Sequence, residues 1–313
     1  MKKTAESAVE TLLKNKTLNL RRGDSDEFSF GRIAFGLPAL DTLTGGGIPR
    51  KRMTILYGPT NVGKSYLASQ VVANVQKEGG IAAWIDTELS WDAEWVSKCG
   101  IDCSNVMVAQ PTNGEEALDT ARELMSAGVD VIVLDSIAGL VPTAMHDEDF
   151  SYSPMAWQAR FVNSSLPKLL PNLKHGSAFI AINQVRSSMG PVALDNMPGG
   201  LGQAFFAHFL LQVRRNGWIK EGNNNVGFDM EVRLRKSKVG GENWRSAVVP
   251  FRVEGGIDVV ESFIREGIDK KLIKQSGPWY EYNENKVMGM NGIKKIFIES
   301  PEILTQLQNE LAS

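Results

Sequence analysis

The sequence has little of what marks a secreted, membrane-spanning or zinc-binding protein. It holds two cysteines, Cys99 and Cys103, and no further Cys/His set lies near them to complete a zinc site. No uninterrupted apolar run approaches the roughly 20 residues that span a bilayer. The first residues, Met-Lys-Lys-Thr-Ala-Glu-Ser, lack the apolar segment of a signal peptide. We therefore expect free thiols in a reducing compartment, a cytoplasmic protein and no membrane partner.

The chain also lacks a strong excess of charge, internal repeats and low-complexity tracts. Its formal net charge is −2, with 42% apolar and 22% charged residues. This composition is typical of a globular protein with a sizeable core, and the length favours one large α/β domain with smaller pieces. Proteins that bind nucleic acid through one large basic face are usually more basic. Any such binding must therefore use local patches or backbone contacts.

The strongest pattern follows an apolar, strand-like run. Gly58-Pro-Thr-Asn-Val-Gly-Lys-Ser65 fits the phosphate-loop pattern G-x-x-x-x-G-K-[ST] at all four fixed positions. The glycines let successive N–H groups point into one concavity, and a helix beginning near Lys64 adds the positive end of its dipole. Lys64 would reach the β- and γ-phosphates, and the Ser65 hydroxyl would ligate Mg²⁺. A chance glycine-rich turn is the alternative, but Leu67 and Val71 indicate the helix that the motif requires.

Two other apolar runs end in acidic residues. The run Ile81-Ala-Ala-Trp-Ile85 closes on Asp86-Thr-Glu88, and the run from Val131 to Leu134 closes on Asp135. In open α/β sheets, ligands bind at the carboxyl ends of the strands. Glu88 is therefore a candidate general base or water-orienting group, with a solvated strand-end acid as the alternative. Asp135 is a candidate for the acid that holds the Mg²⁺ shell in phosphate-loop NTPases.

Periodicity predicts the remaining elements. Helices are expected at 4–14, around 40–43, at 114–127, 155–170, 259–264, 268–273 and 301–311, and strands at 106–109, 178–182, 205–213, 229–234 and 279–282. The basic segment 235–238 is typical of a solvated turn. Residues 185–200 have little periodicity, and so long a run is usually functional or disordered. We expect an N-terminal helix and linker (1–30) for subunit packing, a core (31–254) and a C-terminal lobe (255–313).

Taken together, these stretches resemble the bacterial RecA recombinase family over roughly residues 31 to 300. Besides the phosphate loop, the matching stretches are Trp84–Glu88, Gln110–Leu118, Val131–Ser136, Ile182–Arg186, Lys220–Gly227, Lys236–Lys238 and Gly277–Tyr282. The resemblance implies an α/β fold. It would comprise a RecA-type phosphate-loop ATPase core with a mostly parallel central sheet, a short N-terminal arm and a small C-terminal α+β lobe.

The resemblance also implies ATP and Mg²⁺ as cofactors. It gives Glu88 the catalytic role and makes Gln184 the sensor of the γ-phosphate, for which a capped strand end is the alternative. Lys236 and Lys238 would act across the subunit interface on the neighbour's nucleotide, beside Lys64 of the neighbour's own loop. Mg²⁺ would be held by Ser65 and, through water, by Asp135. The nucleotide-binding set comprises Gly58, Pro59, Thr60, Asn61, Val62, Gly63, Lys64, Ser65, Tyr66, Asp135 and, at the adenine end, Asp92 and Trp95.

In the family, two loops bind single-stranded DNA, and they match residues 145–154 and 186–200 here. The implied DNA-binding residues are Arg160, Arg186, Ser187, Ser188, Met189, Gly199 and Gly200. Phe205 matches a subunit-contact position in a homo-oligomeric helical filament, and the C-terminal lobe helps to capture duplex DNA. The implied activity is ATP-dependent homologous pairing and strand exchange in DNA recombination, repair and the SOS response to DNA damage.

The sequence departs from the family at two positions that concern DNA. Pro167 replaces a helical basic residue, and Leu201 replaces a polar one after Gly200. Two other functions stay open, the first of them because of these two departures. One is an ATP-binding accessory protein of DNA filaments that lacks strand exchange, and the other is a hexameric helicase or other motor with the same fold. Glu88, Lys236 and Lys238 favour the recombinase.

Overall fold

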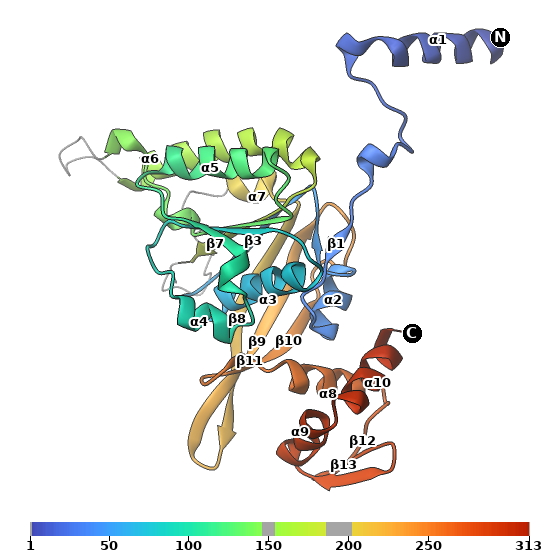
Figure 1. The fold of residues 1–313 in the computed structure, drawn as a ribbon, viewed down its shortest axis with the longest axis vertical. Helices are drawn as coiled ribbons and strands as arrows, with labels where there is room; N and C mark the ends of the chain where they lie inside the picture. The colour runs from blue at the N-terminus through green and yellow to red at the C-terminus, as the bar shows by residue number, and fades with distance from the viewer. Residues whose placement is uncertain (1, 146–153, 186–201, 313) are drawn as a thin grey trace. The chain divides into compact units, whose positions relative to one another are not determined.

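The structure is a computed structural model that describes residues 2–145, 154–185 and 202–312 (Figure 1). The chain divides into two compact units, residues 1–31 and 32–313. Within the described part of the chain, no helix is both long and apolar enough to cross a membrane.

The first unit is a helix followed by an irregular segment. It contains α1 (Lys2–Lys14) and two short 3₁₀ turns, η1 (Lys16–Leu18) and η2 (Asp26–Phe28). From residue 6 to residue 31 no side chain is buried, and the apolar side chains of Val9 and Leu12 are about half exposed. The described residues of this unit therefore provide no core of their own for the apolar side chains of α1.

A nine-stranded sheet forms the centre of the second unit, in the order β11-β10-β9-β8-β3-β7-β6-β4-β5. The strands β8, β3, β7, β6, β4 and β5 run parallel to one another. The pairs β8–β9, β9–β10 and β10–β11 are antiparallel. This mostly parallel sheet confirms the predicted α/β class. The strands are β3 (Met53–Gly58), β4 (Ala82–Asp86), β5 (Val106–Ala109), β6 (Val131–Asp135), β7 (Ala178–Gln184), β8 (Phe209–Glu221), β9 (Asn224–Ser237), β10 (Ser246–Arg252) and β11 (Gly256–Ile257).

Helices cover both faces of the parallel part (Figure 1), which is why β3 and β6 are buried along their whole length. One face packs against α3 (Lys64–Lys77) and α4 (Ala93–Lys98), and the other against α5 (Gly114–Ser126), α6 (Pro154–Ser165) and η6 (Leu166–His175). The helix α2 (Pro38–Thr44) contacts β9 and β10. In β7, Ile180 and Ile182 belong to the first core, whereas Phe179 and Ala181 belong to the second. Consecutive side chains of β7 thus point to opposite faces of the sheet.

Smaller elements connect these layers. A two-stranded ribbon of β1 (Arg32–Ile33) and β2 (Ile48–Pro49) precedes β3. The 3₁₀ turns η3 (Cys103–Asn105), η4 (Ile137–Gly139) and η5 (Thr143–Met145) follow α4 and β6, and the short helix α7 (Gly202–Phe206) precedes β8.

The C-terminal part has a hydrophobic core of its own. It contains α8 (Val259–Asp269), the three-stranded sheet of β12 (Lys274–Ser276), β13 (Trp279–Tyr282) and β14 (Asn285–Met288), then α9 (Met290–Glu299) and α10 (Pro301–Ala312). Ile264, Tyr282, Phe297 and Leu307 form part of this core. The mixture of helices and a small antiparallel sheet agrees with the α+β lobe expected here.

Four predicted elements were wrong in part. Phe205 and Phe206 are helical, and the strand expected from 205 begins only at Phe209, since a short apolar run does not distinguish helix from strand. The predicted helix 268–273 ends at Asp269, because the chain reverses at Lys271, whose φ is 62°. The helix predicted to reach residue 170 ends at Ser165, before Pro167, because proline lacks the N–H that an α-helix needs. Residues 235–237 belong to β9 and do not form a turn.

Candidate functional site

The phosphate loop connects the central strand of the sheet to α3. Gly63 has a φ of 91°, which favours glycine, and a side chain at Gly58 would collide with the carbonyl oxygen of Val213 on β8. Lys64 is 6% exposed, and its Nζ donates to the carbonyl oxygens of Gly58 at 3.2 Å and Pro59 at 2.5 Å. The backbone therefore folds as the motif requires, with the lysine held against the loop.

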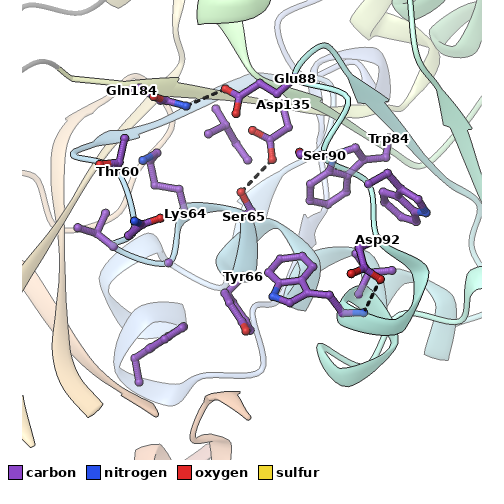
Figure 2. A pocket seen from close by; sticks show the side chains of 18 of the residues that line it. Thr60, Lys64, Ser65, Tyr66, Trp84, Glu88, Ser90, Asp92, Asp135 and Gln184 are labelled. Carbon is purple, nitrogen blue, oxygen red and sulfur yellow. Dashed lines mark hydrogen bonds between the residues drawn. The ribbon is translucent and has the colours of Figure 1, made fainter. Parts of the chain in front are cut away.

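An acid at the end of β6, which is separated from β3 by β7, meets the first turn of α3. Ser65 Oγ donates to Asp135 Oδ2 at 2.8 Å (Figure 2). Burial raises the pKa of Asp135 to about 6, a rise that the hydrogen bond from Ser65 opposes. Burial lowers the pKa of Lys64, whereas Asp135 and Glu88 raise it. A hydroxyl and a carboxylate side by side are the hard oxygen ligands that Mg²⁺ prefers.

No metal cluster stands elsewhere in the described ranges. Among those residues, no group of three or more His, Cys, Asp or Glu side chains could hold a metal ion. The corner of Ser65 and Asp135 offers two oxygen ligands, and a metal held there would take most of its remaining ligands from phosphate and water, as Mg²⁺ does.

Glu88 is held by two donors at the same carboxylate oxygen. Gln184 Nε2 donates to Glu88 Oε1 at 2.7 Å (Figure 2), and Ser136 Oγ donates to the same oxygen at 2.5 Å. The backbone next to Glu88 is also fixed, because Thr87 Oγ1 both accepts from the Ser136 N–H and donates to the Ser136 carbonyl, each at 2.8 Å. The carboxylate therefore has a defined position at the carboxyl ends of β4, β6 and β7.

Asp86 has a structural role in the same segment. It is fully buried and accepts hydrogen bonds from the N–H of Trp91 at 2.8 Å and from Gln110 Nε2 at 3.0 Å. It also accepts one from the N–H of Glu88 at 3.2 Å. These bonds shape the connection that presents Glu88 and then enters α4.

An aromatic wall lies at the other end of the pocket. Asp92 caps α4 by accepting from the N–H of Glu94 at 2.9 Å and of Trp95 at 3.2 Å. The Trp95 ring packs edge-on against Tyr66, with 4.7 Å between ring centroids. The cavity has a volume of about 630 Å³ and reaches from Lys64 to these aromatic side chains. A polar phosphate end and an aromatic end suit a nucleotide.

The structure thus brings together most residues that were predicted to bind nucleotide. The pocket is lined by Thr60, Asn61, Val62, Gly63, Lys64, Ser65, Tyr66, Glu88, Asp92, Trp95, Asp135 and Gln184. Sequence reasoning gave no role to Trp91 and Phe251, which also line it, or to Ser136. Ser136 had a usable signal, because it directly follows the strand-end acid Asp135.

The structure does not bring Lys236 and Lys238 to this pocket. Lys236 pairs with Leu210, which in turn pairs with Ile55 near the amino end of β3, whereas the phosphate loop leaves β3 at its carboxyl end. Lys236 Nζ donates to the carbonyl oxygens of Ala204 at 2.5 Å and Phe205 at 3.1 Å, and Lys238 Nζ donates to that of Phe205 at 2.9 Å. Both lysines are therefore held on α7, away from the loop of their own chain.

The remaining predicted residues lie elsewhere or outside the described part. The side chain of Phe205 is 73% exposed on α7, and Arg160 is exposed on α6. Most of the first predicted DNA-binding loop, residues 145–154, lies outside the described residues. So do most of the predicted DNA-binding residues, namely Arg186, Ser187, Ser188, Met189, Gly199 and Gly200.

Comparisons with known proteins agree with this geometry. Residues 3–258 match the RecA N-terminal domain family. The chain is 33% identical to Protein RecA of Lactiplantibacillus plantarum, over 98% of this chain and 83% of the relative. It is 36% identical to Protein RecA of Acidothermus cellulolyticus (93% and 86%) and 31% identical to that of Acinetobacter baylyi (98% and 90%). With the phosphate loop, the paired acids and the mostly parallel sheet all in place, the chain belongs to the RecA family.

Proposed function

We infer that this protein is an ATP-dependent homologous recombinase and a DNA-dependent ATPase that acts in DNA recombination, repair and the response to DNA damage. The observation that carries this inference is the contact between Gln184 and Glu88 inside a phosphate-loop pocket of a RecA-family chain. We further propose that it polymerises on single-stranded DNA, pairs it with homologous duplex DNA and exchanges strands. The cytoplasm is its proposed location.

The pocket would hold ATP with its triphosphate over the phosphate loop. The loop N–H groups and Lys64 would bind the β- and γ-phosphates, and the adenine would lie near Asp92 and the rings of Tyr66 and Trp95. Ser65 would ligate Mg²⁺ directly and Asp135 through water, and the bound ion supplies charge neutralisation at the phosphates.

Glu88 would orient the attacking water and accept its proton. The donors Gln184 and Ser136 share Oε1 of this carboxylate, which supports a fixed orientation of the group before any water is bound. Gln184 has a second amide hydrogen that it would direct to the γ-phosphate. It would thereby report the presence of that phosphate to the segment that follows β7.

Lys236 and Lys238 would act on the nucleotide of the adjacent subunit. Their position, level with the amino end of β3, supports action between subunits and argues against action within one chain. The exposed Phe205 beside them fits a surface that a second copy covers. A head-to-tail contact of this kind generates a helical filament when its rotation does not close.

We propose that DNA is held chiefly by its backbone. Arg160 and Arg186 would contact phosphates, Ser187, Ser188 and Met189 would belong to the same loop, and the N–H groups of Gly199 and Gly200 would also bind phosphate. Such contacts need little net charge on the protein, which agrees with the formal charge of −2. Sequence selection would then come from base pairing between the DNA strands.

Strand exchange tests the proposal. The protein is incubated with circular single-stranded DNA and linear duplex DNA, with ATP and Mg²⁺, and joint molecules are separated on gels. We expect joint molecules with homologous duplex only, and none without ATP. Filaments and ATP hydrolysis without joint molecules would contradict strand exchange and support the accessory protein, and unwinding of a forked duplex by closed rings would support a motor.

A further inference from the structure

Two neighbouring residues at the end of β7 make hydrogen bonds on opposite faces of the sheet. Gln184 Nε2 donates to Glu88 Oε1 at 2.7 Å in the nucleotide pocket. Asn183 Nδ2 donates to Gln203 Oε1 of α7 at 2.8 Å. Their side chains point to opposite faces because side chains alternate along a strand. The two residues are consecutive in β7, so any shift of the backbone at Gln184 also shifts Asn183.

The contact between Asn183 and Gln203 is buried in an apolar environment. Both residues are 0% exposed, and the hydrophobic core on that face includes Ala181 of β7 and Ala207 just after α7. A buried amide that loses its partner is costly, whereas two apolar side chains of the same shape would pack nearly as well. The amide pair therefore fixes how α7 lies on β7 more specifically than packing alone would.

The other side of α7 carries the surface assigned to the next subunit. Phe205 is 73% exposed, and the carbonyl oxygens of Ala204 and Phe205 accept the hydrogen bonds of Lys236 and Lys238. A displacement of α7 therefore displaces the positions of both lysines.

We propose that Asn183 and Gln203 are a positioning pair that couples the γ-phosphate sensor to the intersubunit surface of α7. Neither residue lines the nucleotide pocket. The pair connects Gln184 to Phe205, Lys236 and Lys238 through the thickness of the sheet. This inference rests on the proposed function, because it gives that function a route by which nucleotide reaches the neighbouring subunit.

The test compares binding of fluorescent single-stranded DNA with a non-hydrolysable ATP analogue and with ADP. In wild type we expect tighter binding with the analogue. In Gln203→Met, which keeps the size but not the acceptor, we expect the ratio of the two affinities to fall roughly two- to thirtyfold. Affinity for the analogue without DNA should stay unchanged, because Gln203 does not touch the pocket. Val162→Ala, a buried change in the same core, is the matched control and should keep the ratio.

A double variant separates positioning from packing. Asn183→Leu with Gln203→Met replaces both amides by apolar groups of similar shape, so its melting temperature should exceed that of Gln203→Met. We expect the ratio to remain reduced. Recovery of the ratio together with stability would overturn the inference, as would a normal ratio in Gln203→Met. A wild-type protein whose DNA affinity ignores the nucleotide would instead contradict the proposed function itself.

Discussion

The side-chain amide of Gln184 lies 2.7 Å from the carboxylate of Glu88, although the two residues are 96 positions apart in the chain. The contact joins the carboxyl ends of β7 and β4, which flank the acid-bearing strand β6. The proposed γ-phosphate sensor and the proposed water-activating group therefore occupy one corner of the pocket. In the proposed mechanism, Gln184 both senses ATP and positions the base that activates the attacking water.

The first prediction concerns Glu88. Glu88→Gln keeps the hydrogen bonds of the side chain but removes its capacity to accept a proton, so ATP hydrolysis should fall by about 10²- to 10⁴-fold. Nucleotide binding should persist, and filaments should stay on DNA. Hydrolysis is measured as phosphate release and filament lifetime by DNA dissociation. Glu94→Gln, at an exposed acid of α4, should behave as wild type. Unchanged hydrolysis in Glu88→Gln would remove this residue from the mechanism.

The second prediction concerns the site shared between subunits. Glu88→Gln and Lys236→Ala should each be nearly inactive alone. Mixed in equal amounts before filament assembly, they should recover about a quarter of wild-type hydrolysis. At a head-to-tail interface, one in four random pairings joins an intact Glu88 to an intact Lys236. Phosphate release from the mixture is the measurement. If the two residues acted within one chain, mixing would restore nothing.

The third prediction concerns the pH dependence of stability. His208 Nδ1 accepts from the N–H of Met53 at 3.2 Å, and burial, followed by the charges of Arg52, Lys238 and Lys236, lowers the pKa of His208 to about 4. The unfolded chain binds this proton near pH 6.5. Between pH 6.5 and 4 the unfolded state therefore binds more protons, and stability falls as pH falls.

This loss should disappear when the imidazole is removed. His208→Gln keeps an acceptor for the Met53 N–H but cannot titrate. The difference in unfolding free energy between wild type and His208→Gln should change by roughly 2 kcal/mol from pH 7 to pH 4, after allowance for partial exposure. Denaturant unfolding at several pH values measures it. A constant difference across that range would show that His208 keeps its ordinary pKa.

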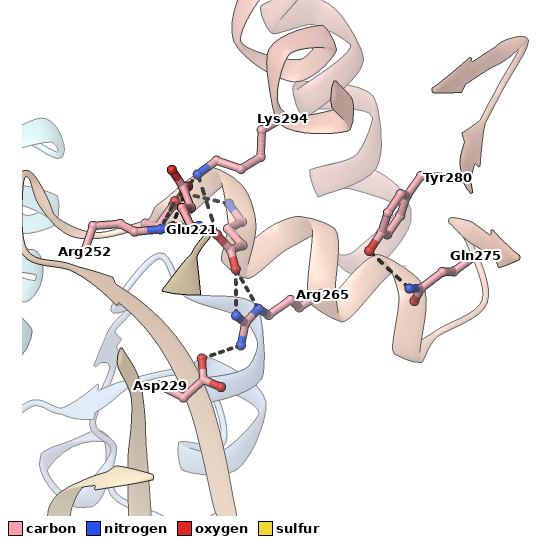
Figure 3. A network of polar contacts seen from close by, with 9 residues as sticks. Glu221, Asp229, Arg252, Arg265, Gln275, Tyr280 and Lys294 are labelled. Atoms are coloured by element: carbon pink, nitrogen blue, oxygen red, sulfur yellow. Dashed lines mark hydrogen bonds and ion pairs between the residues drawn. The ribbon is translucent and has the colours of Figure 1, made fainter. Parts of the chain in front are cut away.

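The fourth prediction concerns the connection between the sheet and the C-terminal lobe. Arg252 of β10, Arg265 of α8 and Lys294 of α9 converge (Figure 3), and all three pair with Glu261. Glu261 is 2% exposed. Its loss would leave three partly buried cations short of a counter-charge, so Glu261→Gln should destabilise the protein by about 3 kcal/mol.

An exposed acid provides the control for this cluster. Glu299 pairs with Lys295 on the surface of α9, and Glu299→Gln should cost at most about 1 kcal/mol, as is usual for exposed ion pairs. Chemical unfolding of both variants measures the contrast. Equal effects would mean that the buried cluster contributes no more than a surface pair.

Local patterns predicted the parts of the site that depend on a few consecutive residues. The loop from Gly58 to Ser65 and the strand-end acids Glu88 and Asp135 were found because motif and burial act over short stretches. Phe205 was predicted to lie in a strand because its apolar neighbours fit a strand as well as a helix, although it lies in α7. Lys236 and Lys238, which donate hydrogen bonds to the carbonyl oxygens of α7, are too distant in the sequence to be recognised as its partners. Such pairings join distant segments and leave no local trace.

The same limit explains what was missed around the pocket and at the lobe. The half of β8 beyond Val213 was not predicted as a strand, because it is exposed and has no alternating apolar face. Pairing with β9 stabilises it instead. Ser136 and Gln203 are ordinary polar residues in sequence, and their roles follow only from the partners Glu88 and Asn183 that the fold brings to them. Likewise, a buried Glu261 could not be distinguished from an exposed acid before its cationic partners were known.

The most direct test of the central claim is ATP hydrolysis by the full chain with and without single-stranded DNA, at fixed low salt and saturating Mg²⁺. We predict slow hydrolysis alone and strong stimulation by single-stranded DNA, because in the proposed mechanism DNA and ATP favour the same arrangement of β7 and its neighbours. Gln184→Ala should lose the stimulation. Hydrolysis by the wild-type protein that proceeds at the same rate with and without DNA would contradict coupling through Gln184, and with it the proposed function.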